Sequence, residues 1–263
     1  MKNYYTKIIL IFALFVAIMG VTVSLIVSED NHFDKNSAHN LAQFLARNGV
    51  IVEEALIDTK TQYVMNTELK SITSDKALLS ENLLGENMSA LAETYTSEVG
   101  TVSFVGSEFN FRPTAEYRCD ITGDANKFDA NKKAQRLLKT LGFNLEGSSF
   151  SNNSENDTIT VTVVKTIEGL PVFDNAIKVC MNKLGTVSIS GRWYSNAGPL
   201  NWRRPSKTVV DALIELMHKR EEPVQITNIS LGYLLKDTSS DISILRPVWQ
   251  FRSDSGELIY IGA

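Results

Sequence analysis

An uninterrupted apolar run near the N-terminus constrains this chain more than any other feature of its sequence. The twenty residues from Ile8 to Val27, IILIFALFVAIMGVTVSLIV, contain no charge and no proline. At about 1.5 Å of rise per residue, a helix of this length spans roughly 30 Å, the thickness of the hydrocarbon core of a bilayer. A cleaved signal peptide usually has a shorter apolar core, of about 7–15 residues. The sequence therefore predicts an uncleaved transmembrane helix over residues 8–28.

The charges beside this run predict its orientation. Lys2 and Lys7 precede it, whereas three acidic residues follow it by position 34. Positively charged residues tend to stay on the cytoplasmic side of a membrane. We therefore expect residues 1–7 to form a short cytoplasmic tail of a single-pass cell-membrane protein whose bulk is extracytoplasmic. Such a tail is too short to form a domain, so a signal that crosses the membrane would pass through the helix.

Small side chains share one face of the predicted transmembrane helix. Ala13, Ala17, Gly20 and Ser24 are separated by four, three and four positions, which places them on the same side of a helix. Small residues let two helix backbones approach closely in lipid, where packing drives association. We predict that this face contacts another transmembrane helix; the alternative is a chance grouping, since small residues are frequent in such spans.

The chain after the anchor is predicted to form helix-and-strand units. The first is an N-terminal subdomain over residues 29–112, where FDKNSAHNLAQFLARNGV predicts a helix, VIVEEALI a strand, and the sequence around Gly106 two further strands. The rest, residues 113–263, forms a C-terminal domain of two units, about 128–196 and 205–263. Apolar residues recur at helical spacing where each unit begins and alternate in the strands that follow.

The two C-terminal units repeat one plan, a helix followed by three strands. The helices are FDANKKAQRLLKTLGF and RPSKTVVDALIELMHKR, and the matching tripeptides PVF and PVW begin at Pro171 and Pro247, 76 residues apart. In the hairpin of the first repeat, the residues expected on one apolar face are Ile177, Val179, Met181, Val187, Ile189 and Trp193. Helices followed by antiparallel meanders predict an α+β fold with helices on one face of the sheet and the other face open.

Three stretches lack a clear strand or helix period. Residues 59–87 are polar with scattered leucines and predict a loop with a short helix. MSALAETY predicts the end of a helix, and the polar stretch EGSSFSNNSENDT predicts a loop.

The composition argues against catalysis and against nucleic-acid binding. The net charge is −4, whereas nucleic-acid surfaces are normally basic. Three histidines and two cysteines occur, without CxxC or HExxH spacing, so no metal or cofactor site is predicted. The serines of GTVSISG and VGSEF do not form a GxSxG turn. We expect a protein without enzymatic activity, cofactor or metal.

The two cysteines are expected to remain unpaired. Cys119 and Cys180 are both predicted to lie outside the membrane, where a disulfide is chemically feasible. Cys180 alternates with Lys178 and Asn182, off the apolar face of its strand, whereas Cys119 is in phase with apolar neighbours. This mismatch favours two free thiols.

The linker between the two C-terminal units contains a candidate binding patch. Trp193 and Trp249 fit the apolar faces of strands, whereas Trp202 follows no such period and precedes Arg203 and Arg204. Aromatic residues and arginine are over-represented in the cores of protein interfaces. We predict that Trp202, Arg203 and Arg204 form a surface contact for a partner.

These features together resemble the YycI/YycH family, with YycI the closer match in length. The resemblance rests on the anchor, the GLPVFDNAIKV hairpin, the strand ISLGYLL and the terminal RPVWQFR and GELIYIGA, and it covers most of the chain. Family members are membrane-anchored accessory proteins of the YycFG (also called WalRK) two-component system in low-GC Gram-positive bacteria. The resemblance implies a PepSY-like/YycI-like α+β fold, and it implies regulation of a YycG/WalK-like sensor histidine kinase through transmembrane and extracytoplasmic contacts. It leaves open whether the chain also pairs with a YycH-like sister protein.

Two alternatives remain open. PepSY-like and protease-propeptide modules share the helix-plus-meander plan and a G-x-PV…G-x-V hairpin, which would make the chain a membrane-tethered inhibitor or chaperone of an extracellular protease. A cell-wall scaffold would instead bind peptidoglycan through its soluble part. The anchor distinguishes the first alternative from a kinase regulator, because a tether tolerates scrambling of the small-residue face and a transmembrane regulator does not.

Overall fold

The computed structural model describes residues 35–58, 60–65, 68–114, 127–155, 158–182, 186–196, 203–237 and 242–263. This part of the chain is mostly β-strand with four α-helices, which confirms the predicted α+β class. The tail and anchor predicted over residues 1–28 lie outside the described residues. Within the described ranges, no helix is long and apolar enough to cross a bilayer.

The chain divides into two compact units that are interleaved in sequence. The first contains the chain up to Tyr63 together with Pro205–Ile229 and Phe251–Ile261. The second contains Val64–Arg204, Ser230–Gln250 and Gly262–Ala263. The subdomains expected from the sequence are consecutive instead. The difference arises because two long C-terminal strands contribute residues to both units, which local periodicity does not indicate.

The first unit contains two α-helices and a small group of strands. Its elements are α2 (Lys35–Arg47), β1 (Val50–Val52), the 3-10 helix η1 (Glu54–Leu56), α5 (Val209–Lys219), the first part of β14 (Val224–Asp237), the end of β15 (Ile242–Ser253) and β16 (Leu258–Gly262). β1 pairs in parallel with β14, from Val50 opposite Val224 to Val52 opposite Ile226. Its buried residues include Leu45, Val50, Val52, Val209, Ala212, Leu213, Leu216, Val224 and Ile226. The two predicted helices are thus confirmed.

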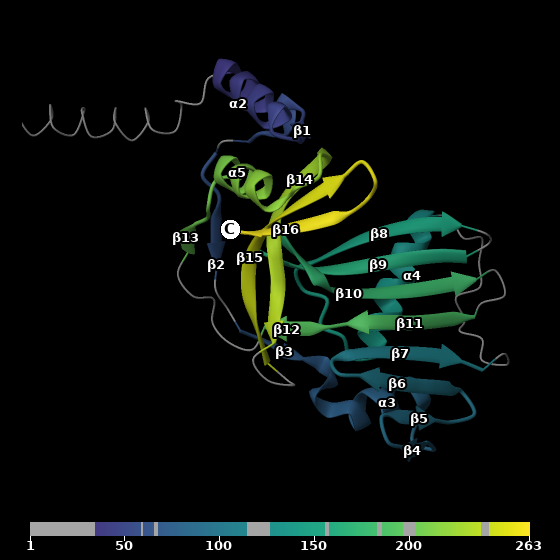
Figure 1. Ribbon diagram of the computed structural model, residues 1–263. Helices are drawn as coiled ribbons and strands as arrows, with labels where there is room; N and C mark the ends of the chain where they lie inside the picture. Colours follow the sequence, from purple (N-terminus) through teal and green to yellow (C-terminus); the bar gives the residue numbers. More distant parts are fainter. Residues whose placement is uncertain are drawn as a thin grey trace, which may run out of the picture. The chain divides into compact units, whose positions relative to one another are not determined.

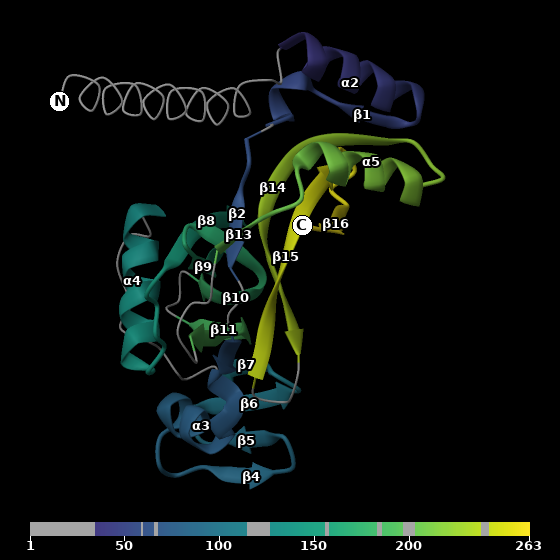
Figure 2. The same ribbon diagram turned by 90° about the vertical axis from the view of Figure 1, so that its left-hand side faces the viewer.

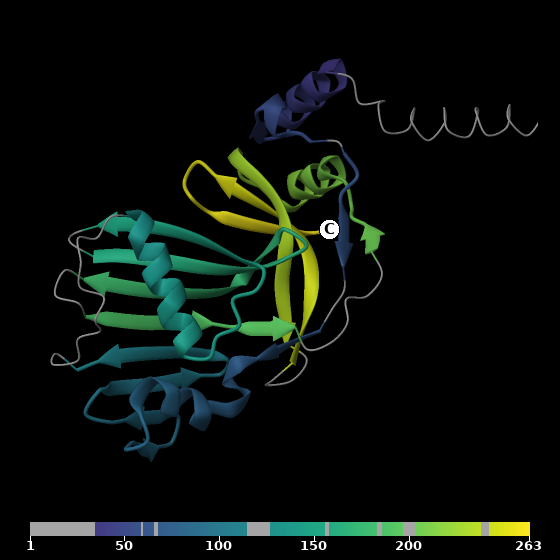
Figure 3. The same cartoon turned by 180° about the vertical axis from the view of Figure 1, so that it is seen from behind.

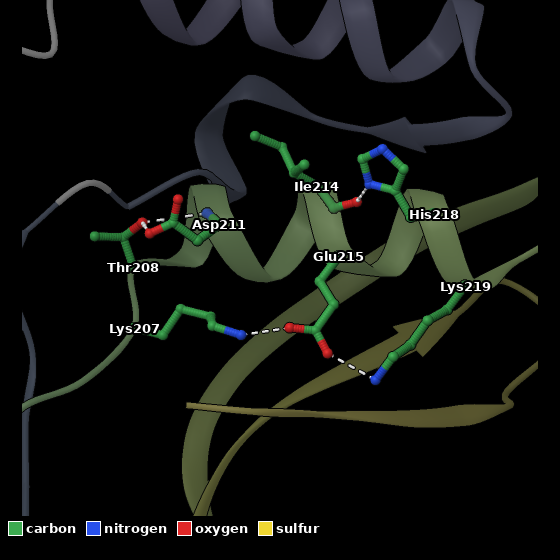
Figure 4. A network of polar contacts seen from close by, with 7 residues as sticks. All are labelled: Lys207, Thr208, Asp211, Ile214, Glu215, His218 and Lys219. Atoms are coloured by element: carbon green, nitrogen blue, oxygen red, sulfur yellow. Dashed lines mark hydrogen bonds and ion pairs between the residues drawn. The ribbon is translucent and has the colours of Figure 1, made fainter.

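The N-terminus of α5 is capped by its own side chains (Figure 4). The Thr208 hydroxyl accepts a hydrogen bond from the backbone N–H of Asp211 at 3.2 Å and donates one to the Asp211 carboxylate at 2.8 Å. This satisfies one of the backbone N–H groups that a helix leaves unpaired in its first turn. At the other end, the ring N–H of His218 donates to the carbonyl oxygen of Ile214 at 2.7 Å.

A carboxylate on α5 lies between two lysines (Figure 4). Glu215 accepts a hydrogen bond from Lys207 and pairs with Lys219 at 2.6 Å. These contacts, the one with Lys207 first, lower the pKa of Glu215 to about 2. The carboxylate is therefore charged throughout the neutral and mildly acidic range.

The second unit is built on an antiparallel sheet. Its elements are β3 (Glu68–Ser71), the 3-10 helix η2 (Ile72–Asp75), α3 (Lys76–Leu84), β4 (Ser89–Leu91), β5 (Thr94–Thr96), β6 (Gly100–Val105), β7 (Glu108–Pro113), α4 (Lys127–Thr140), β8 (Ser148–Glu155), β9 (Thr158–Ile167), β10 (Leu170–Asn182), β11 (Val187–Arg192), β12 (Tyr194–Asn196) and the remainder of β14 and β15. Eight strands pair in the order β8-β9-β10-β11-β7-β6-β5-β4, each antiparallel to its neighbours. The short strands β2 (Tyr63–Met65) and β13 (Arg203–Pro205) form a separate pair.

One face of this sheet is covered by helices. Figure 2 shows α3 and α4 on the same side of the sheet, and Figure 3 shows α4 lying across its strands. The core between them contains Leu79, Leu83, Leu84, Val102, Phe104, Phe109, Phe111, Ala130, Ala134, Leu138, Ile159, Val161, Val163, Ile177, Val179, Met181, Val187, Ile189 and Trp193. The apolar face predicted for the β10–β11 hairpin is confirmed, since all of its six residues belong to this core.

Several strands occur where the sequence predicted other structure. β2 and β3 lie within residues 59–87, which were expected to be a loop with a short helix, although the predicted helix is present there as α3. β8 occupies the stretch expected to be a loop, and β4 and β5 form a hairpin where the end of a helix was expected. Ser and Asn have low intrinsic strand preference. β8 is a strand because it pairs with β9, which follows it directly in the chain, and β4 and β5 pair with each other. None of the three has the clear apolar alternation that marks a half-buried strand in a sequence.

The motif residues PVF and GY meet where β14 runs beside β10. Val172 pairs in parallel with Tyr233. A Cβ on Gly232 would lie 2.5 Å from the carbonyl oxygen of Pro171 and 2.6 Å from the ring of Phe173, so a larger residue does not fit. Only glycine therefore permits this crossing.

A buried asparagine joins β10 to β12. The β9–β10 register shifts between Pro171 and Ala176, and Asn175 lies in this irregular segment with no exposed surface. Its side chain accepts from the backbone N–H of Tyr194 at 2.8 Å and donates to the Tyr194 carbonyl at 2.9 Å. The amide side chain thus makes both hydrogen bonds that a neighbouring strand would make.

Candidate functional site

The face of the sheet opposite α3 and α4 is the candidate site, and we call it the open face (Figure 1). Side chains alternate along each strand, so residues next to the core positions point to this face. The registers align one row of them across seven strands: Ser151, Thr162, Lys178, Ser190, Asn110, Ser103 and Thr94. The row consists of hydroxyl and amide groups around a single central lysine.

A hollow of about 460 Å³ lies in the open face, over β6, β7, β10 and β11. Ligand pockets typically enclose about 300–1,000 Å³. The residues that line it are Ser103, Val105, Glu108, Phe109, Asn110, Asp174, Ala176, Lys178, Ser190, Gly191 and Arg192. The hollow therefore contains two acidic and two basic side chains, with neutral polar groups among them.

Two of these charges are held by the fold. Arg192 forms an ion pair with Asp174 at 3.6 Å and lies over the ring of Tyr194, with 6.0 Å between the guanidinium carbon and the ring centroid. The other oxygen of Asp174 accepts from the backbone N–H of Leu235 at 2.9 Å. A Cβ on Gly191 would lie 2.1 Å from the carbonyl oxygen of Ala176, so this glycine is required for the close approach of β10 and β11 beneath the pair.

The other polar groups of the hollow are not engaged within the described part of the chain. The side chains of Lys178, Glu108, Asn110, Ser190 and Ser103 make no hydrogen bond or ion pair with any described residue. Lys178 is directly opposite Ser190, and Ser190 is directly opposite Asn110. These groups can accept a polar partner without first breaking an internal contact.

The chemistry of this arrangement suits recognition of a polar surface. Hydroxyl and amide groups donate and accept hydrogen bonds, and charges of both signs select a partner of complementary pattern. Val105, 80% exposed at the rim, adds an apolar contact. Among the described residues, no group of three or more His, Cys, Asp or Glu is placed to hold a metal ion.

The site residues predicted from the sequence are only partly described. Ala13, Ala17, Gly20, Ser24 and Trp202 lie outside the described residues. Arg203 and Arg204 are exposed on β13, and Arg203 forms an ion pair with Glu168. Their role as a partner contact stays a prediction.

The prediction that the cysteines are unpaired can be compared with the structure for Cys180. Cys180 is a free thiol on the open face, with its sulfur 3.5 Å from the hydroxyl of Thr160. Cys119 lies outside the described residues. The two tryptophans expected in strand cores are buried, Trp193 at 1% exposure and Trp249 at 5%.

The hollow could not be predicted from the sequence, because the residues that line it come from two distant segments of the chain. Ser103 and Asn110 belong to β6 and β7, whereas Lys178 and Ser190 belong to β10 and β11, much later in the chain. A signal exists within each strand: VSF, FNF and IKV each place a polar residue between two apolar ones, and VSIS alternates apolar and polar residues. That alternation identifies an outward face, but only the pairing of β11 with β7 brings the two halves together.

Comparisons with known proteins add a fold and no function. No family model and no curated protein matches this chain. An uncharacterized protein from Eubacterium rectale has a similar structure, with a TM-score of 0.51 and 12% identity, covering 82% of this chain and 87% of that one. The C-terminal domain of YpeB from Bacillus megaterium aligns with a TM-score of 0.33 and 16% identity, over 74% of this chain and 94% of that domain.

Proposed function

We propose that this chain is a non-catalytic regulator of a sensor histidine kinase, tethered by residues 8–28 and acting through transmembrane and extracytoplasmic contacts. The observation that carries the proposal is the open face, where Lys178, Asn110 and Ser190 lie together with no internal partner in the described part of the chain. The resemblance of the sequence to the YycI/YycH family supports the choice of a YycG/WalK-like kinase as the partner.

A regulator of this kind acts by binding one signalling state more tightly than another. A ligand shifts a conformational equilibrium only by its difference in affinity for the two states. Coupling energies of about 1–3 kcal/mol are typical and shift an equilibrium about 5- to 150-fold. A few hydrogen bonds and one charge pair on the open face suffice for a difference of this size.

The proposal is tested by reconstituting the full chain with the kinase in lipid vesicles and measuring kinase autophosphorylation. Lys178→Glu reverses the charge at the centre of the hollow, and we expect it to abolish at least half of the regulatory effect. Lys139→Glu is the matched control, because Lys139 is exposed on α4 on the opposite side of the sheet. An equal loss of regulation in both variants, or no loss in either, would argue against a role of the open face in regulation.

The tethered protease inhibitor or chaperone remains the second candidate, since its helix-plus-meander plan agrees with α4 lying across β8–β11. Replacing the small residues of the predicted transmembrane face by leucine distinguishes the two. Loss of kinase regulation with intact membrane insertion supports the regulator. Full activity of this variant, together with protease binding by the extracytoplasmic part, supports the inhibitor.

A further inference from the structure

The outer edge of the second unit's sheet is formed by β8. Within the described residues, β8 pairs only with β9, and its other side faces no strand. The β8–β9 register runs without a shift over eight residue pairs, from Ser148 opposite Lys165 to Glu155 opposite Thr158. The strand SSFSNNSE contains no proline, no lysine and no bulge. These are among the devices by which proteins prevent edge strands from pairing, so within the described part of the chain β8 itself carries none of them.

One backbone hydrogen bond shows which backbone groups of β8 point away from β9. The backbone N–H of Thr166 donates to the carbonyl oxygen of Gly147 at 2.6 Å, and this pair continues the β8–β9 register by one step. Along an antiparallel strand, hydrogen bonds to a given neighbour are made by every second residue. The odd-numbered residues of β8 therefore bond to β9. The backbone N–H and C=O groups of Ser148, Phe150, Asn152 and Ser154 are directed away from β9, towards the outer edge of the sheet.

The side chains on the two faces of this edge are compatible with a second strand. Phe150 packs partly against the core, and Asn152 donates to Asn131 of α4 at 3.0 Å. Ser149, Ser151 and Asn153 are exposed on the open face. Apart from Glu155 at its end, β8 is uncharged. No side chain therefore repels an incoming strand by its charge along the length of the edge.

We propose that two copies of this chain pair through β8 and form one continuous antiparallel sheet. The two copies are related by a twofold axis perpendicular to the sheet. When Ser151 lies on this axis, the four outward residues of one copy pair with the four outward residues of the other. Ser148 is then opposite Ser154 of the second copy, and Phe150 is opposite Asn152 of the second copy. This register uses all four outward residues of each strand, for about eight backbone hydrogen bonds between copies.

The self-complementarity of the strand is what favours a second copy over another partner. In this register, Ser151 meets its own equivalent, Ser149 meets Asn153, and Glu155 meets Gly147. The pairs on the open face are thus small and neutral, and no two carboxylates oppose each other. A shift by two residues leaves one outward residue of each copy without a partner. The inference does not depend on the proposed regulation of a kinase.

Position-specific disulfides test the register in the full chain, in detergent micelles. The background carries Cys119→Ser and Cys180→Ser so that each variant has one thiol. Ser151→Cys places two thiols opposite each other at a pair that is not hydrogen-bonded, where Cα atoms are about 4.5 Å apart, within the range for a disulfide. In Asn153→Cys the two thiols are four residues out of register, about 14 Å apart.

We expect Ser151→Cys to form a covalent dimer on mild oxidation at least ten times faster than Asn153→Cys, with unchanged circular dichroism. Ser151→Lys places two ammonium groups on the axis, and we expect it to raise the dimer dissociation constant at least tenfold in sedimentation velocity. Thr160→Lys, on the same face but one strand inward, is the control. Equal crosslinking at both cysteine positions would overturn the proposal. A wild-type chain that remains monomeric would also overturn it and leave the edge to a strand of another protein.

Discussion

Single residues decide how closely the strands of the second unit approach. Asn175 replaces the hydrogen bonds of a missing strand partner, and Gly191 and Gly232 remove the Cβ atoms that would collide with β10. Glycine and asparagine are visible in the sequence, but their roles depend on the strand that lies opposite. Residue identity alone therefore does not reveal these roles, which the crossing of the strands explains.

Asn175→Ala should destabilise the protein by about 2–4 kcal/mol, because it removes two hydrogen bonds from buried backbone groups and each such loss costs about 1–3 kcal/mol. Urea unfolding of the full chain in micelles, followed by tryptophan fluorescence, measures the change. Asn110→Ala, at a half-exposed position of the open face, is the control and should change the stability by less than about 0.5 kcal/mol. A similar midpoint for Asn175→Ala and the wild type would contradict the assigned role.

Glu215 should make stability depend on pH in acid. Its pKa in the folded protein is about 2, below the usual value of 4.5, so folding favours the charged form. Its contribution is present above pH 4.5 and is lost as the pH falls from 4.5 towards 2. Glu215→Gln should therefore be less stable than the wild type at pH 6, and the difference should shrink over this window. Thermal unfolding at a series of pH values tests this, and a difference that is constant with pH would contradict it.

Strands and helices with strong periodicity were predicted well from the sequence. β9 alternates threonine with buried Ile159, Val161 and Val163, and α5 has a cap residue and an apolar stripe. β8 was missed because serine and asparagine give no apolar alternation. The order β11-β7-β6, which joins two distant segments and forms the hollow, was not predictable, since strand pairing between such segments has no local signal.

The crossing of β14 and β10 should be intolerant of a side chain at Gly232. A Cβ there meets a backbone carbonyl and an aromatic ring, and overpacking of this kind typically costs about 1–3 kcal/mol. Gly232→Ala should therefore lower the unfolding midpoint in urea. Gly262→Ala is the matched control in a strand, because its Cβ would have only an ordinary contact with the end of Arg246. Equal stability of the two variants would show that the strands can separate at little cost.

At the scale of the whole molecule, the chain combines a predicted anchor with two units that are interleaved in sequence, one of which has an open sheet face. The fold class and the existence of an uncovered face followed from the helix-plus-meander pattern. The interleaving did not, because β14 and β15 are each longer than a single predicted strand and contribute to both units. The site on the open face was predicted only as a face, without the hollow that Lys178 and Asn110 share.

We propose regulation of a sensor kinase through the predicted transmembrane helix together with the open face, and photocrosslinking in native membranes tests the identity of this partner most directly. A photoreactive residue at Gly20 lies on the predicted small-residue face, and one at Phe15 lies mostly on another face. Mass spectrometry of the captured proteins should identify a histidine kinase from Gly20 and not from Phe15. Capture of no membrane protein from either position, while the extracytoplasmic part binds a protease, would contradict the account.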